Sequence, residues 1–235
     1  MATITMPMVD EAALARLLTW LSPAYPTGAF SYSHGLETAV EEGAVANRED
    51  LIAYVAAALS LGAGAVDGPL LALAWRAAAA DDAGRLDDVV ELATAWRGTA
   101  ELALEALQPG AAFAAVTATT WPDPRFAAFV ACHPGRLSHA VAFGAAAAWH
   151  GVPLRAAAFG WLSTFAANII SAGVRLIPLG QTDGQMATAA LMPEVAAATE
   201  AACSTQDIEA LGSTAPALDL FSMRHETQYT RLFRS

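Results

Sequence analysis

Alanine dominates this chain and constrains its fold more than any other feature. Roughly a quarter of the residues are alanine, and leucine is the usual large apolar companion. Both residues favour helices, whereas strand-type alternation of β-branched residues is scarce. Prolines divide the chain into short segments, because proline disrupts the interior of a helix. The pattern predicts an all-α fold, a single compact bundle of about ten helices with flexible N- and C-terminal segments.

Helical periodicity places several of these helices. Four leucines at i, i+3, i+4 and i+7 predict one amphipathic helix: Leu14, Leu17, Leu18 and Leu21. Asn47 predicts the N-cap of another helix, and Pro69 the first turn of a third. Later helices are expected over residues 86–96, 123–131, 138–150, 154–176, 185–191 and 205–211. Because no repeat or interdomain linker interrupts them, we predict a single domain over residues 1–235.

The charge of the chain excludes several classes of function. It carries 12 basic and 23 acidic side chains, for a formal net charge of −11, and every basic residue is arginine. An acidic surface repels a phosphate backbone, so we expect no nucleic-acid partner. The lack of lysine excludes a Schiff-base lysine and the lysine of a P-loop. Cys132 and Cys203 show no CxxC spacing, which fits a reducing compartment.

Two uncharged windows, residues 137–154 and 156–174, are long enough to cross a bilayer. Polar or helix-breaking residues interrupt both windows: His139, His150, Pro153, Ser163, Thr164, Asn168 and Ser171. We therefore expect buried helices of a soluble bundle and no membrane association. The first residues, MATITMPMVDEAA, contain no basic stretch, so no signal peptide is expected and the predicted location is the cytoplasm.

The common nucleotide-binding and hydrolase motifs are missing. Gly62, Gly64 and Gly68 miss the dinucleotide fingerprint by one residue, and the segment before them is predicted to be helical, so an interhelical loop is expected there. Ser33 and His34 lack a GxSxG elbow and an orienting acid. A serine cap on the following helix is the favoured interpretation of Ser33. A small-molecule enzyme that uses a Ser33/His34 pocket remains the alternative function.

The histidines do not form a recognisable metal motif. They show no i, i+4 pair and no HExxH: His34, His133, His139, His150 and His225. His133 and His139 could meet Cys132 in three dimensions, but scattered histidines usually satisfy local hydrogen bonds. We predict no metal site and no cofactor on this chain.

Three polar-rich segments interrupt the alanine-rich sequence. The first, SPAYPTGAFSYSHGLE, covers residues 22–37, and the second, VRLIPLGQTDGQ, covers residues 174–185. The third, SMRHETQYTRLFRS, covers residues 222–235. From residue 224 onward it holds three arginines and one glutamate, so it is cationic on an acidic protein.

This cationic terminus has two interpretations of equal weight. It could fold back on its own domain, or it could become ordered only against a partner. In a helical tail, Tyr229 and Phe233 would share one face at i, i+4 and could anchor a partner. Our domain prediction therefore treats residues 224–235 as a partner-ordered tail.

The three segments, in this order, resemble the signature stretches of the UreF family of urease accessory proteins. The first resembles the family pattern SP-x-x-P-x-G-x-F-x-Y-S-x-G-L-E, and the other two resemble its central and C-terminal motifs. The alanine-rich helices between the motifs are expected to carry little family information.

The resemblance implies an all-α, non-enzymatic scaffold for nickel insertion into apo-urease. Members of the family form homodimers and bridge UreD, also called UreH, with the GTPase UreG. It further implies that GTP is bound by UreG, that nickel is handled by the assembled complex, and that UreG hydrolysis is coupled to nickel delivery. The missing P-loop and the missing lysine agree with this division of roles.

The resemblance also carries over partner-binding residues. In the first segment these are Phe30, Tyr32, Gly35, Leu36 and Glu37. In the second they are Gln181, Asp183 and Gln185, with Gly184 only matching the motif, and in the third Arg224, His225, Glu226, Tyr229 and Arg231. Because the family's C-terminal region is implicated in contact with UreD/UreH, Tyr229 and Arg231 are the expected contacts there.

Overall fold

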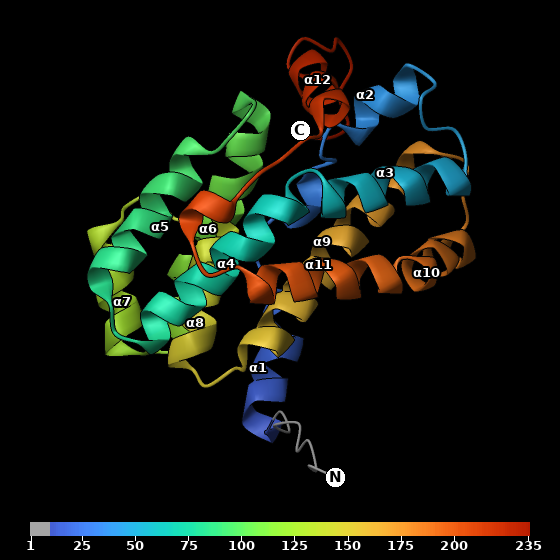
Figure 1. Cartoon of the computed structure of the whole chain (residues 1–235). Coiled ribbons are helices and arrows are strands. Elements are labelled where there is room, and N and C mark those ends of the chain that lie inside the picture. The colour runs from blue at the N-terminus through green and yellow to red at the C-terminus, as the bar shows by residue number, and fades with distance from the viewer. Residues whose placement is uncertain (1–9) are drawn as a thin grey trace.

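A computed structural model describes residues 10–235, and within this range the chain forms twelve α-helices and no strand. The helices are α1 (Glu11–Trp20), α2 (Leu36–Glu41), α3 (Arg48–Ser60), α4 (Gly64–Ala79), α5 (Ala83–Ala95), α6 (Ala100–Thr120), α7 (Pro124–Cys132), α8 (His139–Trp149), α9 (Leu154–Leu176), α10 (Gln181–Ala190), α11 (Met192–Ser204) and α12 (Pro216–His225). This confirms the predicted all-α bundle (Figure 1). The expected absence of a signal peptide concerns the first residues, of which 1–9 lie outside the described range.

Helices α4 and α8 form the most extensive helix–helix contact among the described residues. Small residues bring the two helices close, because α8 is mostly alanine and is buried along nearly its whole length. Gly144 marks the closest approach, since a Cβ there would collide with the carbonyl oxygen of Leu71 on α4. Alanine and glycine thus replace thick layers of large side chains, which is the packing that the composition predicts.

Helix α1 faces the core with a different stripe from the predicted one. Leu17 is buried together with Ala13 and Trp20, whereas Leu14 is 48% and Leu18 68% exposed. The Trp20 indole explains the rotation, because it packs edge-to-face among several aromatic rings, with the centroid of Phe113 at 5.7 Å. A large aromatic ring buries more apolar area than a leucine, and it therefore decides which face points inward.

Two predicted segments differ from the structure. The glycine-rich loop expected around residues 62–68 is largely the start of α4, so Pro69 lies inside that helix rather than in its first turn. Residues 205–211 form only a short 3₁₀ turn, Ile208–Ala210, instead of an α-helix. By contrast, α9 has the predicted bounds, with Pro153 as its N-cap.

Helix α9 is the one helix in residues 10–235 that is long and apolar enough to cross a membrane on its own. Half of its apolar window is buried inside the protein, where it packs against α4, α8 and α11. Helices α3 and α4 pass the same test only as a pair that is bent by 41°. Much of the apolar surface of α9 is therefore packed against other helices of the protein.

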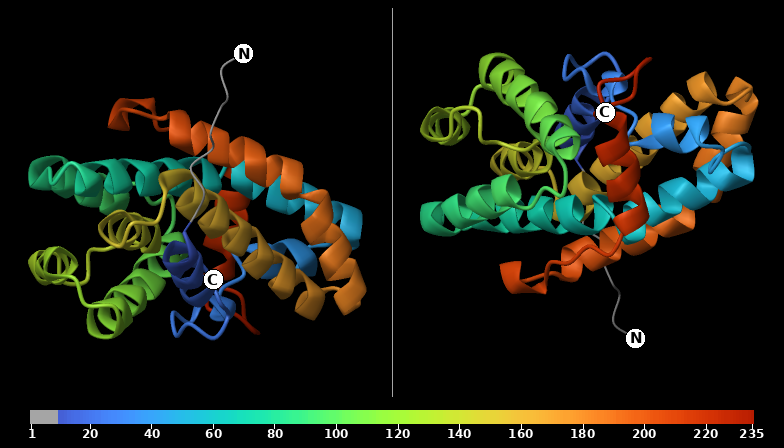
Figure 2. Two further views of the ribbon diagram at one scale, coloured as in Figure 1. Left: turned by 90° about the horizontal axis from the view of Figure 1, so that it is seen from below. Right: turned by 90° about the horizontal axis from the view of Figure 1, so that it is seen from above.

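The two ends of the described chain lie far apart in the view of Figure 1. Helices α2 and α12 pack against each other at the upper end, near the C-terminus, whereas α1 lies at the lower end. The view from above shows α12, α2 and the last residues together (Figure 2). Consequently, segments one and three meet at one end of the bundle.

Candidate functional site

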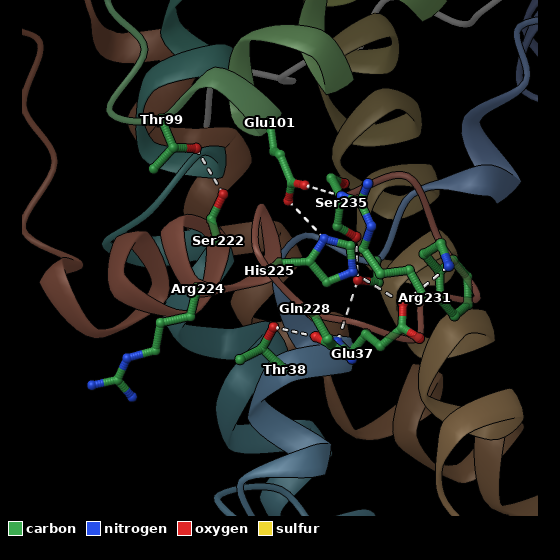
Figure 3. Close-up of polar contacts among 12 residues, drawn as sticks. Glu37, Thr38, Thr99, Glu101, Ser222, Arg224, His225, Gln228, Arg231 and Ser235 are labelled. Carbon is green, nitrogen blue, oxygen red and sulfur yellow. Dashed lines mark hydrogen bonds and ion pairs between the residues drawn. The ribbon is translucent and has the colours of Figure 1, made fainter.

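A buried histidine on α12 lies between two carboxylates from distant parts of the chain (Figure 3). The Nδ1 atom of His225 lies 2.8 Å from Glu101 Oε2, and its Nε2 atom lies 3.0 Å from Glu37 Oε2. Arg231 donates a further hydrogen bond of 2.8 Å to Glu101 Oε1. We call these four side chains, Glu37, Glu101, His225 and Arg231, the clasp.

Glu37 joins the first segment to the C-terminal tail. Its Oε1 atom accepts the Leu232 N–H at 2.7 Å, and its Oε2 atom accepts the Phe233 N–H at 2.9 Å. Together with the bond from His225, one carboxylate thus binds both α12 and the chain that follows it. Hydrogen bonds to an ionised carboxylate are stronger than neutral ones, so Glu37 can fix the path of the tail.

The clasp balances its own charge when His225 is protonated. Its two carboxylates then face an imidazolium and a guanidinium, and both ring nitrogens act as donors. Burial raises the pKa of Glu101, and the nearby His225 and Arg231 offset this effect only in part. Such a buried cluster is stable only while all its members are paired.

Gly35 lets α2 approach α12 closely. Its φ angle is +74°, and a Cβ at this position would lie 3.0 Å from the backbone nitrogen of Ser222. The Ser222 hydroxyl in turn forms a 2.7 Å hydrogen bond with the Thr99 hydroxyl at the start of α6. Glycine is therefore needed here both for the left-handed backbone and for the close contact.

The end of the tail pairs with the first segment through its backbone. The Arg234 N–H donates to the Ser31 carbonyl at 2.8 Å, and the Ser33 N–H donates to the Ser235 carbonyl at 2.9 Å. The ring of Phe233 is buried, with the Arg175 guanidinium 4.3 Å from its centroid. The structure thus folds the tail back on its own domain, which is one of the two interpretations that the sequence left open, and ordering against a partner stays a prediction.

Tyr229 and Phe233 do not form the predicted common anchor face. Helix α12 ends at His225, and the residues after it form turns and bends. Tyr229 is consequently fully exposed, whereas Phe233 is buried. The helical spacing fails because the hydrogen bonds of Glu37 hold residues 232–233 in a non-helical path.

Sequence reasoning missed the α6 side of this site. Glu101, Glu105 and Gln108 lie at i, i+4 and i+7, so they form a polar stripe on a largely apolar helix. Glu105 pairs with His34 Nδ1 at 3.2 Å and accepts the Ser235 hydroxyl at 2.8 Å. The spacing of this stripe was the signal that could have revealed it.

The predicted residues of the first segment lie mostly inside the protein. Tyr32 and Leu36 are buried, and the Tyr32 hydroxyl donates to Gln108 Oε1 at 2.6 Å. Phe30 alone among the predicted residues of this segment is widely exposed, and its carbonyl accepts a 3.0 Å hydrogen bond from Arg175. In this conformation, Glu37 holds the tail, and Tyr32 and Leu36 are buried rather than presented to a partner.

The predicted residues of the third segment divide into buried and exposed groups. His225 is completely buried in the clasp. Arg224 lies on the surface and forms a 2.6 Å ion pair with Glu42. Glu226 and Tyr229 are exposed, and Arg231 is partly exposed beside Glu101. Direct partner contact therefore stays a prediction for the exposed residues of this segment.

The second segment lies apart from the other two. Asp183 accepts the Gly180 N–H at 3.1 Å at the start of α10 and also pairs with Arg48 at 3.1 Å. Gln181 and Gln185 are exposed on α10, which packs against α9 and α3 rather than α12. Asp183 thus has a local structural role, and the glutamines remain surface candidates.

Helix α12 and the tail carry several exposed apolar side chains. Leu220 and Met223 lie on α12, and Tyr229 and Leu232 lie on the tail; about half or more of each side chain is open to solvent. Four large apolar residues on one short stretch of chain are typical of a surface that contacts another protein.

The Ser33/His34 pair does not form a nucleophile and base. The Ser33 hydroxyl donates to the Ser235 carbonyl and accepts the Glu37 N–H at 3.3 Å, in the first turn of α2. His34 Nδ1 faces Glu105 instead. Gly35, not Ser33, is the N-cap of α2, although the Ser33 hydroxyl accepts one backbone N–H of the first turn.

No three His, Cys, Asp or Glu side chains gather as metal ligands within residues 10–235. His133 forms an ion pair of 2.9 Å with Asp87, and Cys132 is exposed. His139 Nδ1 instead accepts a 3.3 Å hydrogen bond from the Trp161 indole. The suggested meeting of Cys132, His133 and His139 is therefore not formed.

The fold and the clasp together define a class of protein. It is an all-α protein that uses its buried polar groups to position its own C-terminal segment, with exposed apolar residues around it. A family model with the description UreF matches residues 45–192. The chain belongs to the UreF family.

Relatives of nearly the same length support this membership. A protein of Granulibacter bethesdensis with the name urease accessory protein UreF is 62% identical over 225 residues, covering 96% of this chain and 95% of its own. One from Rhodopseudomonas palustris (strain BisB5) with the same name is 50% identical and covers 96% and 93%. Another from Methylorubrum populi is 46% identical and covers 94% and 98%.

The matched region covers only part of the three polar segments. It contains the second segment, but the first and third segments lie outside residues 45–192. The match also runs through the alanine-rich helices between residue 45 and the second segment.

Proposed function

We propose that this chain is a urease maturation factor, a chaperone or scaffold that bridges UreD/UreH and the GTPase UreG. It regulates GTP-dependent nickel insertion into apo-urease and is not itself an enzyme. The observation that carries the proposal is the clasped tail, which holds Tyr229 and Leu232 exposed beside α12. Family membership supplies the context, since the relatives are named as urease accessory proteins.

The proposal assigns the chemistry to the partners. UreG binds GTP, and nickel is handled by the assembled complex, so this chain needs no cofactor. It acts in the cytoplasm, forms a homodimer, and contacts apo-urease through the complex, with no nucleic acid and no membrane involved. Arginine as the only basic residue suits planar, bidentate contacts at such interfaces.

The clasp divides the tail residues into two roles. Glu37 and His225 are buried and act by positioning, since they cannot touch a partner in this conformation. Tyr229, Leu232 and Arg224 are exposed and contact UreD/UreH. Aromatic and arginine side chains often contribute most of the energy of an interface.

The first test mixes the purified chain with UreD/UreH and GTP-loaded UreG, and weighs the products by light scattering after gel filtration. A complex that contains all three, and that is absent when this chain is omitted, supports the bridging role. A lone monomer that ignores both partners would overturn it.

A second test locates the contact. Tyr229→Ala combined with Leu232→Ala is expected to weaken capture of UreD/UreH at least tenfold, and deletion of residues 224–235 is expected to abolish it. Leu18→Ala, which truncates a side chain that is also widely exposed but lies on α1, is the matched control. Full-strength capture by the folded deletion variant would show that the tail is not the contact.

A further inference from the structure

A cavity of about 290 Å³ lies beside the clasp and is not used by the proposed function. Helices α4, α6, α8, α9 and α12 supply most of its walls, and the loop at residues 96–98 supplies another part. Trp96 and Ser213 line it and are themselves exposed, so the cavity opens to solvent. Its volume is near the lower end for small-molecule sites.

Acidic groups outnumber basic ones in the wall. Asp67 and Arg97 form a buried bidentate pair with distances of 2.8 and 3.1 Å, and so neutralise each other. Glu105 faces His34. Asp219 has no hydrogen bond or ion pair to its carboxylate from any residue in the range 10–235. With Asp67, Glu105 and Asp219 ionised and His34 and Arg97 protonated, the wall still carries one net negative charge.

The field of these acids converges on His34. Burial lowers the pKa of His34, but Glu105, Asp67 and Asp219 together raise it above the ordinary value. All three carboxylates belong to residues that line the cavity. A cavity with this field attracts a positive ligand and repels an anion.

Aromatic and uncharged polar groups complete the wall. The rings of Trp161 and Phe165 are stacked with centroids 5.8 Å apart, and Trp96 adds a third aromatic ring. Thr164 and Asn168 line the cavity, and neither side chain has a hydrogen-bond partner among the described residues. Aromatic rings beside carboxylates are the surroundings that bind organic cations.

We propose that this cavity binds a small planar organic cation of the guanidinium class, with Asp219 as its counter-ion and the aromatic rings as its apolar wall. A bare metal ion would need several ligands on one point, and no such group of three occurs in the described chain. A guanidinium needs only carboxylate acceptors and aromatic contact, which the wall supplies. This inference goes beyond the proposed function and does not depend on it.

The binding test uses methylguanidinium as the probe and methylurea as its neutral, planar analogue. Binding is followed by the fluorescence of the tryptophans in the wall and by calorimetry on the full chain. Methylguanidinium is expected to bind saturably, and methylurea at least about tenfold more weakly, because only the first carries charge. Equal binding of both probes, or no saturable binding at millimolar concentration, would overturn the proposal.

A matched pair of variants places the ligand. Asp219→Asn removes a partner-free carboxylate and is expected to weaken methylguanidinium binding about tenfold with the helical circular dichroism unchanged. Glu209→Gln removes an exposed carboxylate that does not line the cavity, and should leave the affinity unchanged. An affinity for methylguanidinium that Asp219→Asn leaves unchanged would contradict the assignment. Tighter binding of Ni²⁺ than of methylguanidinium, with displacement of the probe, would contradict it as well.

The same chemistry can come from a free molecule or from an arginine side chain of a partner. A blocked tripeptide with a central arginine separates the two sources. If methylguanidinium binds and the arginine tripeptide does not, the natural ligand is a free small molecule. If both probes bind, the natural ligand is an arginine side chain that a partner inserts into the cavity.

Discussion

At the scale of single residues, Glu37 has the largest role in holding the tail. Its carboxylate accepts one bond from the His225 ring and two from the tail backbone. Glu37→Gln keeps the size but removes the charge, so each of these bonds weakens. We expect the Leu232 and Phe233 amides to exchange with solvent roughly 100-fold faster, which corresponds to about 3 kcal/mol.

The control for Glu37→Gln is Glu42→Gln. Glu42 forms an ion pair with Arg224, but both side chains are well exposed. Exposed pairs contribute little, so this variant should change the same amide exchange rates by less than about fivefold. Equal effects of the two variants, measured by hydrogen exchange and mass spectrometry, would refute the special role of Glu37.

A comparison of two glycines separates the stability cost of backbone strain from the cost of a close contact. Gly28 and Gly35 share a φ angle of +74°, but only Gly35 would place a Cβ against α12. Replacement by alanine costs about 1 kcal/mol at Gly28 through strain alone. Gly35→Ala is expected to cost about 2 kcal/mol or more, because the contact with Ser222 is added. Urea denaturation of the two variants compares these costs.

The contributions of two histidines to the stability of the fold should change with pH in opposite directions. The pKa of His34 is raised above 6.5, so its contribution to stability is present below pH 6.5 and is lost as the pH rises through the raised value. Burial lowers the pKa of His139 to about 4, so the folded protein loses up to about 3 kcal/mol as the pH falls from 7 to 4.

Denaturation of His34→Gln and His139→Gln at pH 5, 7 and 9 tests both signs. His34→Gln should destabilise the protein more at pH 5 than at pH 9. His139→Gln should show the reverse, with its smallest cost at pH 5. A parallel pH profile for both variants would contradict the assignment of the shifts.

At the scale of helices, the face that a helix buries is harder to predict than its length. The bounds of α9 followed from Pro153 and a sustained apolar period. The face of α1 did not follow from its leucines, because Trp20 sets the rotation through contacts with residues distant in sequence. Similarly, residues 205–211 have helical composition but form a 3₁₀ turn and extended chain.

The candidate site, like the helices, could be predicted from the sequence only in part. The first and third polar segments were recognisable from their residues, but their meeting was not, because it depends on packing. The α6 stripe was also hidden, since Glu101 and Glu105 look like ordinary solvent-facing acids in the sequence. Only the fold shows that they accept bonds from His225 and Ser235.

The orientation of α1 gives a prediction at this scale. Leu17→Ala removes a buried side chain and is expected to cost about 2–4 kcal/mol. Leu18→Ala changes a residue that is 68% exposed and should cost less than about 0.5 kcal/mol. The sequence pattern placed both leucines on one buried stripe, so similar losses in thermal or urea denaturation would favour that pattern over the structure.

At the scale of the whole molecule, one continuous core connects most of the described helices. Helices α4, α8 and α9 share this core, and α1 and α12 each contribute to it. We therefore expect a single cooperative unfolding transition. Far-ultraviolet circular dichroism and tryptophan fluorescence should give the same midpoint. Two separate midpoints would show that the chain contains two independently stable units.

The clasp also has a consequence during synthesis of the chain. Glu37 precedes its partner Leu232 by 195 residues. A ribosome adds about 5–20 residues per second, so Glu37 emerges roughly 10 to 40 s before that partner exists. Throughout this interval the first segment has been translated, but the tail residues that bind Glu37 have not. The fold of this protein is therefore completed only after nearly the whole chain has left the ribosome.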